Sequence, residues 1–409
     1  MNILLCCEHF YPSVGGVQKM MYELGLRFAM HGHQVTVVTS WREDRLQDSI
    51  DGIRIVSFKV LGNEASGMSG QIDEYQAFLK QGDFDFLLVM AAQQWTFDAM
   101  LPILDNIPCR KLHIPCGYSG LYMARYQDYY GAMPRYLEKF DQLIYNATEY
   151  RDIDFARRHG LRQINIIPAG ASEFEFADPP SPCGRTALGI APDDFVFLSV
   201  GAPAYSKGHR EVVKAYLALD LPFRSTLVLN GNYDGAAALR LSSTHASIKE
   251  TLKELARRFL GRSPVSIERL AAANRDSRKR ILFTNLDRTT LISLFFEAEL
   301  FVFASHVEYS PLVIYECLAA GLPFVSIPVG NVPEIAAWSN GGLICEGKVD
   351  ARGFSRADPT VLASAMRELA LSPKRREVLA RHGRKSWEEK FTWEIIASRI
   401  EQLISPGRE

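Results

Sequence analysis

The sequence predicts an α/β protein made of two doubly wound, Rossmann-like domains, each on a parallel sheet. Short apolar runs alternate with amphipathic segments along the chain, which is the pattern of βαβ units. The chain has 409 residues, too many for one ordinary core, so two domains are expected. Hydrophobic residues make up 47% of the chain and charged residues 23%, as is typical of soluble globular proteins.

Charge and cysteine usage narrow the classes of function. A formal net charge of -1 does not support nucleic-acid binding as the main task. The 7 cysteines are odd in number and form no C-x-x-C pair, which fits a reducing cytoplasm better than a disulfide framework. The N-terminus lacks the basic start of a signal peptide, and no apolar run is long enough to span a membrane. We therefore expect a cytoplasmic protein, with peripheral contact at the inner membrane face left open.

The first expected domain covers residues 1–172. A helix over 17–31 follows its first strand and ends at Gly32. The expected strands are short apolar runs at 2–7, 34–39, 52–58, 86–90, 111–115, 142–146 and 164–168.

A proline-rich segment, 173–185, is the expected linker to a second domain over 186–390. The C-terminal segment 391–409 holds a last helix over 394–404. The strands expected in the second domain cover 195–200, 225–230, 280–284, 300–304, 324–327 and 342–344. The helices expected there cover 211–219, 236–260, 289–298, 311–320, 359–371 and 376–390.

The segment 308–323 carries the most chemical information. It reads Glu-Tyr-Ser-Pro-Leu-Val-Ile-Tyr-Glu-Cys-Leu-Ala-Ala-Gly-Leu-Pro. Pro311 suits the first position of a helix, and Ser310 before it is a good N-cap. Gly321 suits the left-handed residue after a helix, and Pro323 prevents the helix from resuming. The segment therefore predicts one short helix.

Glu316 is the one charged residue of this helix. A helix that is apolar all round is buried, and a buried carboxylate needs a partner. At the helix start, the N–H groups of Leu312 and Val313 lack helical partners and lie at the positive end of the dipole. This pattern can hold a nucleotide diphosphate, with its phosphates on these N–H groups, its ribose on Glu316 and its attached group near Glu308. The alternative is a buried structural helix whose Glu316 is merely salt-bridged.

The pair Glu308 and Glu316, followed by Ala-Ala-Gly-Leu-Pro, resembles the carboxylate-x7-carboxylate motif of the retaining glycosyltransferases of family 4, also called the glycosyl transferases group 1 family. The resemblance covers nearly the whole chain and is more specific in the second domain. It implies the GT-B fold, with two domains facing across a cleft and the last helix crossing back to the first. It also implies sugar transfer with retention from a nucleotide-diphospho-sugar to an acceptor hydroxyl.

A second similarity concerns the loop Gly-Ala-Pro-Ala-Tyr-Ser-Lys-Gly-His at 201–209. It resembles the family's Gly-Arg-x-x-x-x-Lys-Gly loop, whose Arg and Lys hold the diphosphate. Lys207 fits this role, since a cation there would neutralise the leaving group. Ala202 stands where the family has Arg, so Arg210 and His209 are candidates for a substitute cation.

The donor site is also expected to include the start of the first helix. Pro-Ser-Val-Gly-Gly at 12–16 resembles the family's Pro-x-x-Gly-Gly segment over the donor phosphates. We expect Glu308 and Lys207 as catalytic residues. The donor-binding residues that we expect are Gly15, Gly16, Lys207, Glu308, Tyr309, Ser310, Pro311, Leu312, Val313 and Glu316. We expect no cofactor. We also expect no metal, because Asp83 and Asp85 directly precede the strand at 86–90 and are typical of solvated carboxylates at the start of a strand.

The acceptor side resembles the family less closely. The family often places a His-Gly pair after a strand in its first domain, whereas here Cys116 precedes Gly117. His113 and Cys116 have opposite parity on an extended strand, so Cys116 is the counterpart of the family's histidine. The expected acceptor-side residues are Cys116, Gly117, Tyr118 and His113.

The expected partners are a nucleotide-diphospho-sugar donor and a glycan, lipid-linked or small-molecule acceptor, and no nucleic acid. Three other functions stay open. One is a GT-B enzyme of another reaction, such as a nucleotide-sugar epimerase or a phosphorylase. Another is a catalytically impaired nucleotide-sugar-binding relative, which Ala202 and Cys116 would explain. The last is a nicotinamide-dependent dehydrogenase, against which the absence of the Gly-x-Gly-x-x-Gly fingerprint counts.

Overall fold

Each of the chain's two units is built around one parallel β-sheet. The computed structural model describes residues 1–181, 183–231, 267–350 and 354–404. The first unit comprises Met1–Glu173, Tyr309–Tyr315 and the chain from Trp387 onward. The second unit comprises Phe174–Glu308 and Glu316–Ser386.

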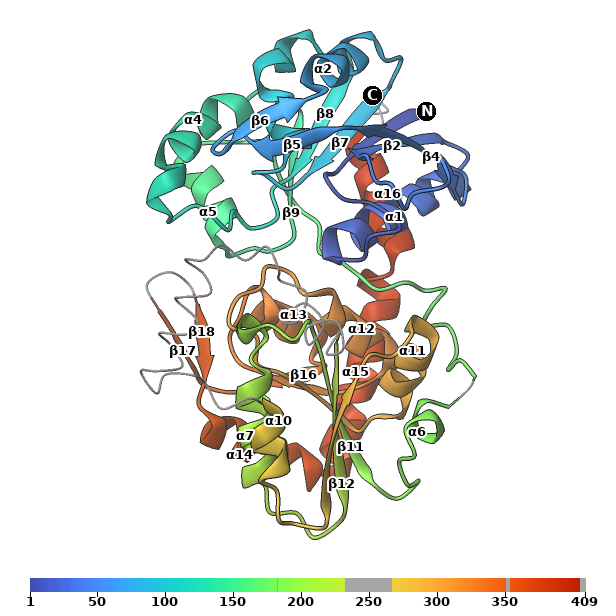
Figure 1. Ribbon diagram of the computed structural model, residues 1–409, viewed down its shortest axis with the longest axis vertical. Helices are drawn as coiled ribbons and strands as arrows, with labels where there is room; N and C mark the ends of the chain where they lie inside the picture. Colours follow the sequence, from blue (N-terminus) through green and yellow to red (C-terminus); the bar gives the residue numbers. More distant parts are fainter. Residues whose placement is uncertain (182, 232–266, 351–353, 405–409) are drawn as a thin grey trace. The chain divides into compact units, whose positions relative to one another are not determined.

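The first unit's sheet has, within the described residues, the strand order β10-β9-β8-β7-β1-β2-β4-β3 (Figure 1). Apart from β3, its strands pair in parallel. Strands of a parallel sheet are covered on both faces, which explains their continuous apolar runs. Their bounds are β1 Asn2–Cys6, β2 Gln34–Ser40, β3 Ser49–Ile50, β4 Ile53–Phe58, β7 Phe86–Met90, β8 Arg110–Ile114, β9 Gln142–Tyr145 and β10 Ile164–Ile166.

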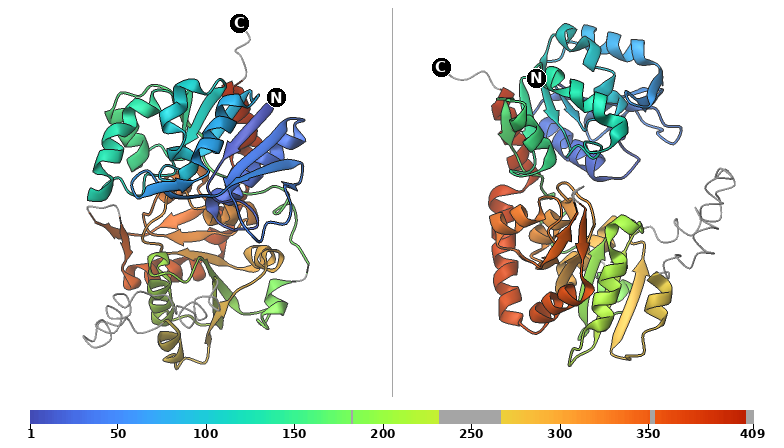
Figure 2. Two further views of the ribbon diagram at one scale, coloured as in Figure 1. Left: turned by 45° about the horizontal axis from the view of Figure 1, so that its top comes forward. Right: turned by 90° about the vertical axis from the view of Figure 1, so that its left-hand side faces the viewer.

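Helices cover both faces of this sheet. Helix α1 (Gly16–Met30) packs on β2 and β4, and α16 (Trp393–Ile404) packs on α1 (Figure 2). The other face is covered by helices and by a small hairpin, β5–β6. These elements are β5 Val60–Asn63, β6 Gly67–Gly70, α2 Ile72–Gln81, α3 Trp95–Asp98, η1 Leu101–Asn106, η2 Ala124–Tyr126, α4 Gln127–Leu137 and α5 Arg151–Arg158.

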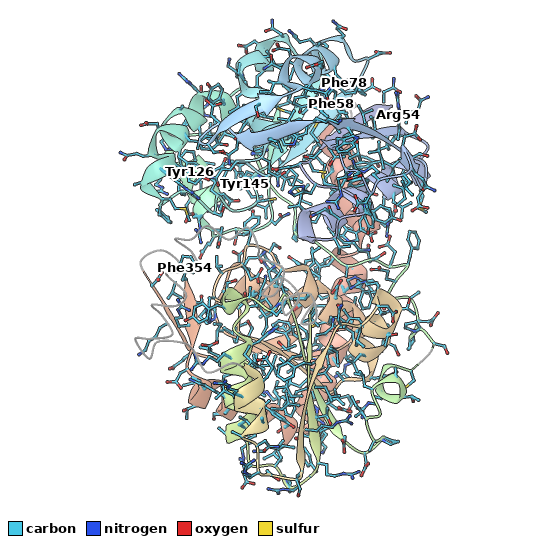
Figure 3. The ribbon with its side chains drawn as sticks, viewed as in Figure 1. Arg54, Phe58, Phe78, Tyr126, Tyr145 and Phe354 are labelled. Atoms are coloured by element: carbon cyan, nitrogen blue, oxygen red, sulfur yellow. The ribbon has the colours of Figure 1, made fainter. Side chains whose placement is uncertain are left out.

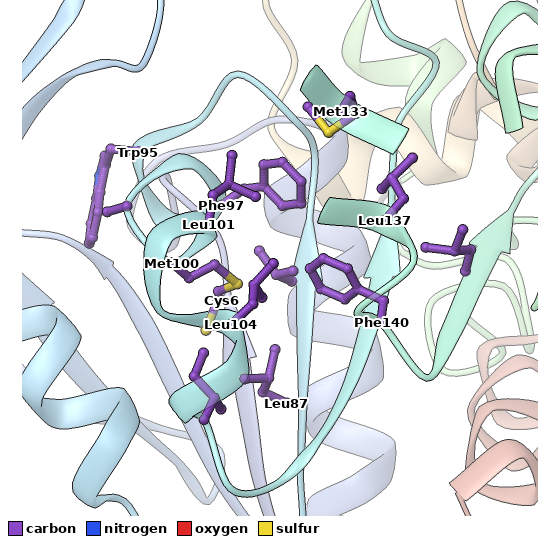
Figure 4. Packing of buried hydrophobic residues seen from close by; sticks show 14 of the residues in the cluster. Cys6, Leu87, Trp95, Phe97, Met100, Leu101, Leu104, Met133, Leu137 and Phe140 are labelled. Carbon is purple, nitrogen blue, oxygen red and sulfur yellow. The ribbon is translucent and has the colours of Figure 1, made fainter. Parts of the chain in front are cut away.

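The core of the first unit joins strand and helix side chains. Cys6 and Leu87 from the sheet pack with Phe97 and Leu104 from the following segments (Figure 4). The rings of Phe58 and Phe78 extend this core edge to face, 5.8 Å apart (Figure 3), and Tyr145 is fully buried in it. Each large apolar side chain buried in this way contributes about 1.5–3 kcal/mol to stability.

The second unit's main sheet has, in the part of the chain that the structure describes, the order β13-β12-β11-β14-β15-β16. All its neighbours pair in parallel. A separate antiparallel hairpin is formed by β17 and β18. The bounds are β11 Phe195–Val200, β12 Ser225–Asn230, β13 Lys279–Thr284, β14 Leu300–Phe303, β15 Phe324–Ser326, β16 Gly342–Ile344, β17 Gly347–Val349 and β18 Ser355–Ala357.

Helices α7 and α14 pack together on one face of this sheet (Figure 1). The helical elements of the second unit are α6 Gly184–Ala187, η3 Tyr205–Lys207, α7 His209–Ala218, α10 Ile267–Ala272, α11 Arg288–Glu297, α13 Val332–Ser339 and α14 Pro359–Ala370. Two further helices, α12 Leu312–Ala320 and α15 Pro373–Lys390, each have residues in both units. None of the described helices combines the length and apolar character that a membrane span requires.

The expected strands are confirmed to within two residues at either end. The helix expected over 376–390 begins earlier, at Pro373, because proline fits the first helical turn. The sequence pattern gave no sign of the β5–β6 hairpin or of α2. The helix expected over 236–260 lies outside the described residues.

Candidate functional site

The strand order of the second unit reverses between β11 and β14. β12 and β13 lie on one side of this pair, and β15 and β16 lie on the other. In open α/β sheets, ligands bind beyond the carboxyl ends of the strands at such a reversal. η3 follows β11, and the segment leading to α12 follows β14. The topology therefore brings Lys207 and Glu308 to the same edge of the sheet.

Gly208 lets η3 lie directly against the end of β14. Its φ is +66°, and a Cβ atom at this position would lie 1.8 Å from the carbonyl oxygen of Ala304. Two hydrogen bonds join the same segments: the His306 N–H and the Ser305 hydroxyl donate to the Ser206 carbonyl, at 2.7 and 3.0 Å. A side chain at position 208 would therefore push these segments apart.

Lys207 and Glu308, both expected as catalytic, form an ion pair. Lys207 Nζ donates to Glu308 Oε1 at 2.6 Å, and Ser305 Oγ donates to the same oxygen at 2.7 Å. The side chains of Lys207 and Glu308 are 31% and 14% exposed, so a ligand can reach both. Hydrogen bonds between charged groups are about twice as strong as neutral ones, so this contact fixes the positions of both side chains.

The start of α12 leaves two backbone donors open. The Ser310 hydroxyl, expected to cap the helix, lies 3.3 Å from the Tyr315 hydroxyl instead, so the cap prediction is wrong. The Ile314 N–H donates to the Pro311 carbonyl at 3.1 Å. Among the described residues, the N–H groups of Leu312 and Val313 have no hydrogen-bond partner. These two N–H groups, at the positive end of the helix dipole, can therefore donate hydrogen bonds to an anion.

Glu316, one turn deeper in α12, is 7% exposed and is paired with Arg288. Arg288 Nη2 lies 2.6 Å from Glu316 Oε1 and 2.7 Å from Glu175 Oε2. Although burial disfavours the charge of Arg288, the two carboxylates hold its pKa above the usual value. In the described chain, Glu316 Oε2 has no hydrogen-bond partner. The expected salt bridge is thus present, and it leaves one carboxylate oxygen available.

Sequence reasoning missed two arginines at this edge, because both come from distant segments. Arg288 begins α11, and Arg356 lies in β18 of the small hairpin. Arg356 Nη1 lies 2.7 Å from His306 Nδ1, and the His306 side chain is almost fully buried. His209, a candidate substitute cation, is buried, and burial followed by the charge of Lys207 lowers its pKa to about 4. The structure therefore does not support His209 as the substitute cation.

The expected first-unit donor residues, Gly15 and Gly16, lie at the start of α1. A Cβ atom at Gly16 would meet nothing within 4 Å, whereas one at Gly15 would meet the side chain of Gln18 at 2.5 Å. Gly16 therefore borders open space, which a ligand group could occupy.

The loop after β8 places Cys116, Gly117 and Tyr118 in left-handed conformations, with φ of 57°, 83° and 46°. Non-glycine residues in this region are strained, and such strain is common at functional sites. The Gly117 N–H donates to Asp152 Oδ2 at 2.8 Å, and burial raises the pKa of Asp152 to about 6. Burial also raises the pKa of the Cys116 thiol to about 12, so Cys116 is an uncharged, poorly nucleophilic group.

His113 lies in the core of the first unit. Its ring stacks on Phe97 with centroids 4.3 Å apart, and its Nδ1 lies 3.1 Å from the Val89 carbonyl. Burial lowers its pKa to about 3. A side chain with no exposed surface cannot contact an acceptor, so the structure does not support the role expected of His113.

Tyr309, expected to meet the donor through its backbone, belongs to the first unit, and its side chain packs within that unit. Its hydroxyl accepts a hydrogen bond from the Asn146 N–H at 2.9 Å and bonds to Asp152. Its ring lies 5.1 Å from that of Tyr150. The phenol is therefore occupied by protein contacts, which leaves the backbone of Tyr309 for the role that the sequence suggested.

Asp85 has a structural partner in the first unit. Its Oδ2 accepts a hydrogen bond from the Asn2 N–H at 2.6 Å, at the start of the sheet. Asp83 takes part through its carbonyl, which accepts from the Asn2 side chain at 3.0 Å. In the described ranges, no group of three or more His, Cys, Asp and Glu residues is arranged to hold a metal ion.

Known proteins resemble this chain at two levels, and the first is sequence. The profile of the family described as Glycosyl transferases group 1 matches residues 184–386. Glycogen synthases from two strains of Mycobacterium tuberculosis are 29% identical to this chain over 119 residues. The matched stretch covers 29% of this chain and only 27% of each glycogen synthase.

The second level is structure. A sucrose-phosphate synthase from Thermosynechococcus elongatus superimposes with a TM-score of 0.72 at 19% identity, over 98% of both chains. HepE from Anabaena, solved in complex with UDP, gives 0.69 at 16% identity, over 99% of this chain and 100% of that one. A UDP-2-fluoro glucose-bound trehalose-6-phosphate protein from E. coli gives 0.62 at 15% identity, over 100% of both chains. At these identities the likeness shows the fold, which is GT-B.

Proposed function

We propose that this protein transfers a sugar from a nucleotide-diphospho-sugar to an acceptor hydroxyl, because the profile of the glycosyl transferases group 1 family matches residues 184–386. We further propose that the transfer retains the anomeric configuration and needs no metal ion. The chain is thus assigned a transferase activity of the hexosyltransferase type. The acceptor is a hydroxyl of a glycan, a lipid-linked sugar or a small molecule.

One observation carries this proposal: Lys207 and Glu308 form a pair at the sheet reversal, and Glu308 lies four residues before the open helix start at Leu312. The diphosphate of the donor is assigned to the N–H groups of Leu312 and Val313. Lys207 leaves Glu308 and pairs with the phosphates, because a phosphate group carries more negative charge than one carboxylate. A lysine and a helix start can together neutralise the departing diphosphate, which is the work that a metal ion does in other transferases.

Glu308 is assigned to the sugar. Once Lys207 has moved to the phosphates, the Glu308 carboxylate can accept hydrogen bonds from sugar hydroxyls, while Ser305 still holds its Oε1 oxygen. Glu316 is assigned to the ribose through its Oε2 oxygen, with Arg288 on Oε1. These two carboxylates therefore have different tasks: one orients the sugar and the other anchors the nucleoside.

The chemical step breaks the bond between the anomeric carbon and the diphosphate oxygen and forms a bond to the acceptor oxygen. The acceptor proton passes to the departing diphosphate oxygen, so no protein nucleophile is needed. The positive charge that develops on the sugar ring lies beside Glu308, and the negative charge on the leaving group lies beside Lys207. Attack on the face that the leaving group vacates accounts for retention.

UDP-sugars are the first donors to test. Solved relatives include HepE in complex with UDP-glucose, although at 15% identity they do not assign a donor to this chain. A cytoplasmic location agrees with the free state of Cys6, Cys7, Cys109, Cys116, Cys183, Cys317 and Cys345. If the acceptor is lipid-linked, the reaction takes place at the membrane surface through peripheral contact.

A thermal-shift screen of UDP-, GDP-, ADP- and dTDP-sugars tests the proposal, followed by acceptor assays with the stabilising donor. NMR of the product gives its anomeric configuration, and transfer in the presence of a chelator tests the independence from metal. If none of these nucleotide-sugars raises the melting temperature of the protein, the proposed function is overturned. Conversion of the donor without an added acceptor would indicate an epimerase instead.

A further inference from the structure

Arg356 is an exposed cation beside the loop 201–209, which contains Lys207. No acidic side chain among the described residues neutralises Arg356. It lies in β18, about 150 residues along the chain from η3, which it contacts. Its Nη1 donates to the Tyr205 hydroxyl at 3.1 Å and lies 2.7 Å from His306 Nδ1. Tyr205 belongs to the same three-residue turn as Lys207.

The surrounding contacts hold Arg356 in place. Its guanidinium lies 5.3 Å from the centre of the Tyr205 ring, a cation–π arrangement. The Ser355 N–H donates to the His306 carbonyl at 2.7 Å, and the Ser355 hydroxyl donates to the Pro328 carbonyl. The backbone of β18 is therefore fixed to the segment between β14 and Glu308.

His306 is the second side chain that contacts Nη1 of Arg356. An arginine only donates hydrogen bonds, so His306 Nδ1 must accept, and the ring proton of the neutral form then lies on Nε2. His306 Nε2 faces Glu211 Oε2 at 3.4 Å. The Glu211 carboxylate thus faces the His306 ring from the side opposite Nδ1, and Nδ1 holds the guanidinium.

Two nitrogens of Arg356 remain available. Among the described residues, neither Nε nor Nη2 has a hydrogen-bond partner. These two donors form the flat edge that binds two phosphate oxygens at once. Arg356 thus differs from Arg288 at the same edge, whose guanidinium is occupied by Glu175 and Glu316.

We propose that Arg356 is a phosphate-binding residue of the donor site, supplying from a separate hairpin the cation that the loop lacks at Ala202. This inference rests on the proposed function. In it, Lys207 and Arg356 share the diphosphate: Lys207 acts as a point charge, and Arg356 binds two oxygens. The ligand class is a nucleoside diphosphate, and both of its phosphates are needed for the full effect.

The test measures the binding of UDP, UMP and uridine by calorimetry for the wild type and for Arg356→Ala and Arg356→Lys. Removal of a hydrogen bond to a charged group should weaken UDP binding roughly tenfold or more. UMP binding should weaken less, and uridine binding should not change. Arg356→Lys should restore only part of the loss, because lysine cannot bind two oxygens in one plane.

Three further variants separate phosphate binding from a structural effect. Arg381→Ala removes an exposed arginine from α15 in the same unit and should leave UDP binding unchanged. Tyr205→Phe removes the hydroxyl contact of Arg356 and should cost less than Arg356→Ala. Arg210→Ala tests the other candidate cation, and a loss there that exceeds the loss in Arg356→Ala would overturn the inference.

The outcomes also separate the inference from the proposed function. If the wild type binds UDP and Arg356→Ala binds it equally well, the inference is overturned and the proposed function stands. An equal loss for uridine and UDP would show that Arg356 only supports the loop, which also overturns the inference. If the wild type binds no nucleoside diphosphate, the inference about Arg356 and the proposed function are both overturned.

Discussion

Lys207 Nζ lies 2.6 Å from Glu308 Oε1, although the two residues are 101 positions apart in the sequence. The pair stands at the carboxyl ends of β11 and β14, where the strand order of the second unit reverses. In this pair each side chain neutralises the charge of the other. A bound diphosphate would take over Lys207 and leave Glu308 to the sugar, so the pair gives the first prediction.

Lys207→Ala and Glu308→Ala should each lower kcat/KM by about 100-fold or more, because each removes a group that stabilises charge in the transition state. The double variant should lose less than the product of the two single effects, since the residues contact each other. Steady-state transfer assays with the donor found in the screen give these values.

Lys214→Ala is the control for this prediction, because Lys214 is an exposed lysine on α7 in the same unit. Its transfer rate should equal that of the wild type. Unchanged transfer in both Lys207→Ala and Glu308→Ala would remove these residues from the mechanism.

Glu316→Gln tests the assignment of the ribose. The change removes the charge that accepts the ribose hydroxyls, so UDP affinity should fall roughly tenfold. The affinity for 2′,3′-dideoxy-UDP should not fall, because that ligand has no ribose hydroxyls to lose. Calorimetry with the two ligands checks the difference.

A folding control belongs to the same experiment, since Glu316 also pairs with Arg288. Arg288 keeps Glu175 as a partner in the variant, so Glu316→Gln should remain folded with a lower melting temperature. Equal losses for both ligands would mean that Glu316 has a structural role only.

Gly208→Ala should destabilise the protein and slow transfer, because the new Cβ atom would lie 1.8 Å from the Ala304 carbonyl oxygen. Gly189→Ala is a matched control: its φ is also positive, at +58°, but nothing lies within 4 Å of the added atom. Gly208→Ala should therefore cost about 1–3 kcal/mol more than Gly189→Ala, the usual range for forced overpacking. Urea unfolding of both variants measures the difference, and equal costs would contradict the close approach.

The stability of the first unit should depend on pH through His31, which joins α1 to α16. Hydrogen bonding to Glu401 raises the pKa of His31 above 6.5 against the effect of burial, and Glu394 adds to the rise. Its Nδ1 lies 2.8 Å from Glu401 Oε1, and its Nε2 lies 2.9 Å from Glu394 Oε1. His33 also contacts Glu401, at 3.1 Å.

A raised pKa in the folded state means that the protonated form stabilises folding. This stabilisation is complete below the unfolded value of 6.5 and is lost as pH rises through the higher folded value. The wild type should therefore exceed His31→Gln in unfolding free energy at about pH 6, and the gap should narrow by about pH 9. A gap that stays constant or widens with pH would contradict the ion pairs.

Much of the fold could be predicted from the sequence because its elements depend on local chemistry. The apolar runs of a parallel sheet and the proline and glycine around α12 act within a few residues. The N-cap expected of Ser310 is absent, although its hydroxyl has a partner only five residues away. Its hydroxyl bonds to Tyr315, and propensity cannot foresee which of two nearby partners a serine will choose.

The chemically important pairings could not be predicted, since they join distant segments. Arg288 meets Glu316 across 28 residues, and Arg356 meets His306 across 50 residues. No periodicity connects such residues. His113 shows the converse case: a histidine next to a motif was assigned a role, but packing on Phe97 buries it completely.

The order of residues alone was enough for the class of the chain, the parallel strands of its two main sheets and the short helix with an open start, because these follow from hydrophobic period and backbone chemistry. Folding in three dimensions was needed to select which charges stand together: Lys207 with Glu308, Glu316 with Arg288, and Arg356 beside Tyr205. The physical reason is that electrostatic and hydrogen-bond energies depend on distance in space, and chain connectivity sets that distance only for near neighbours.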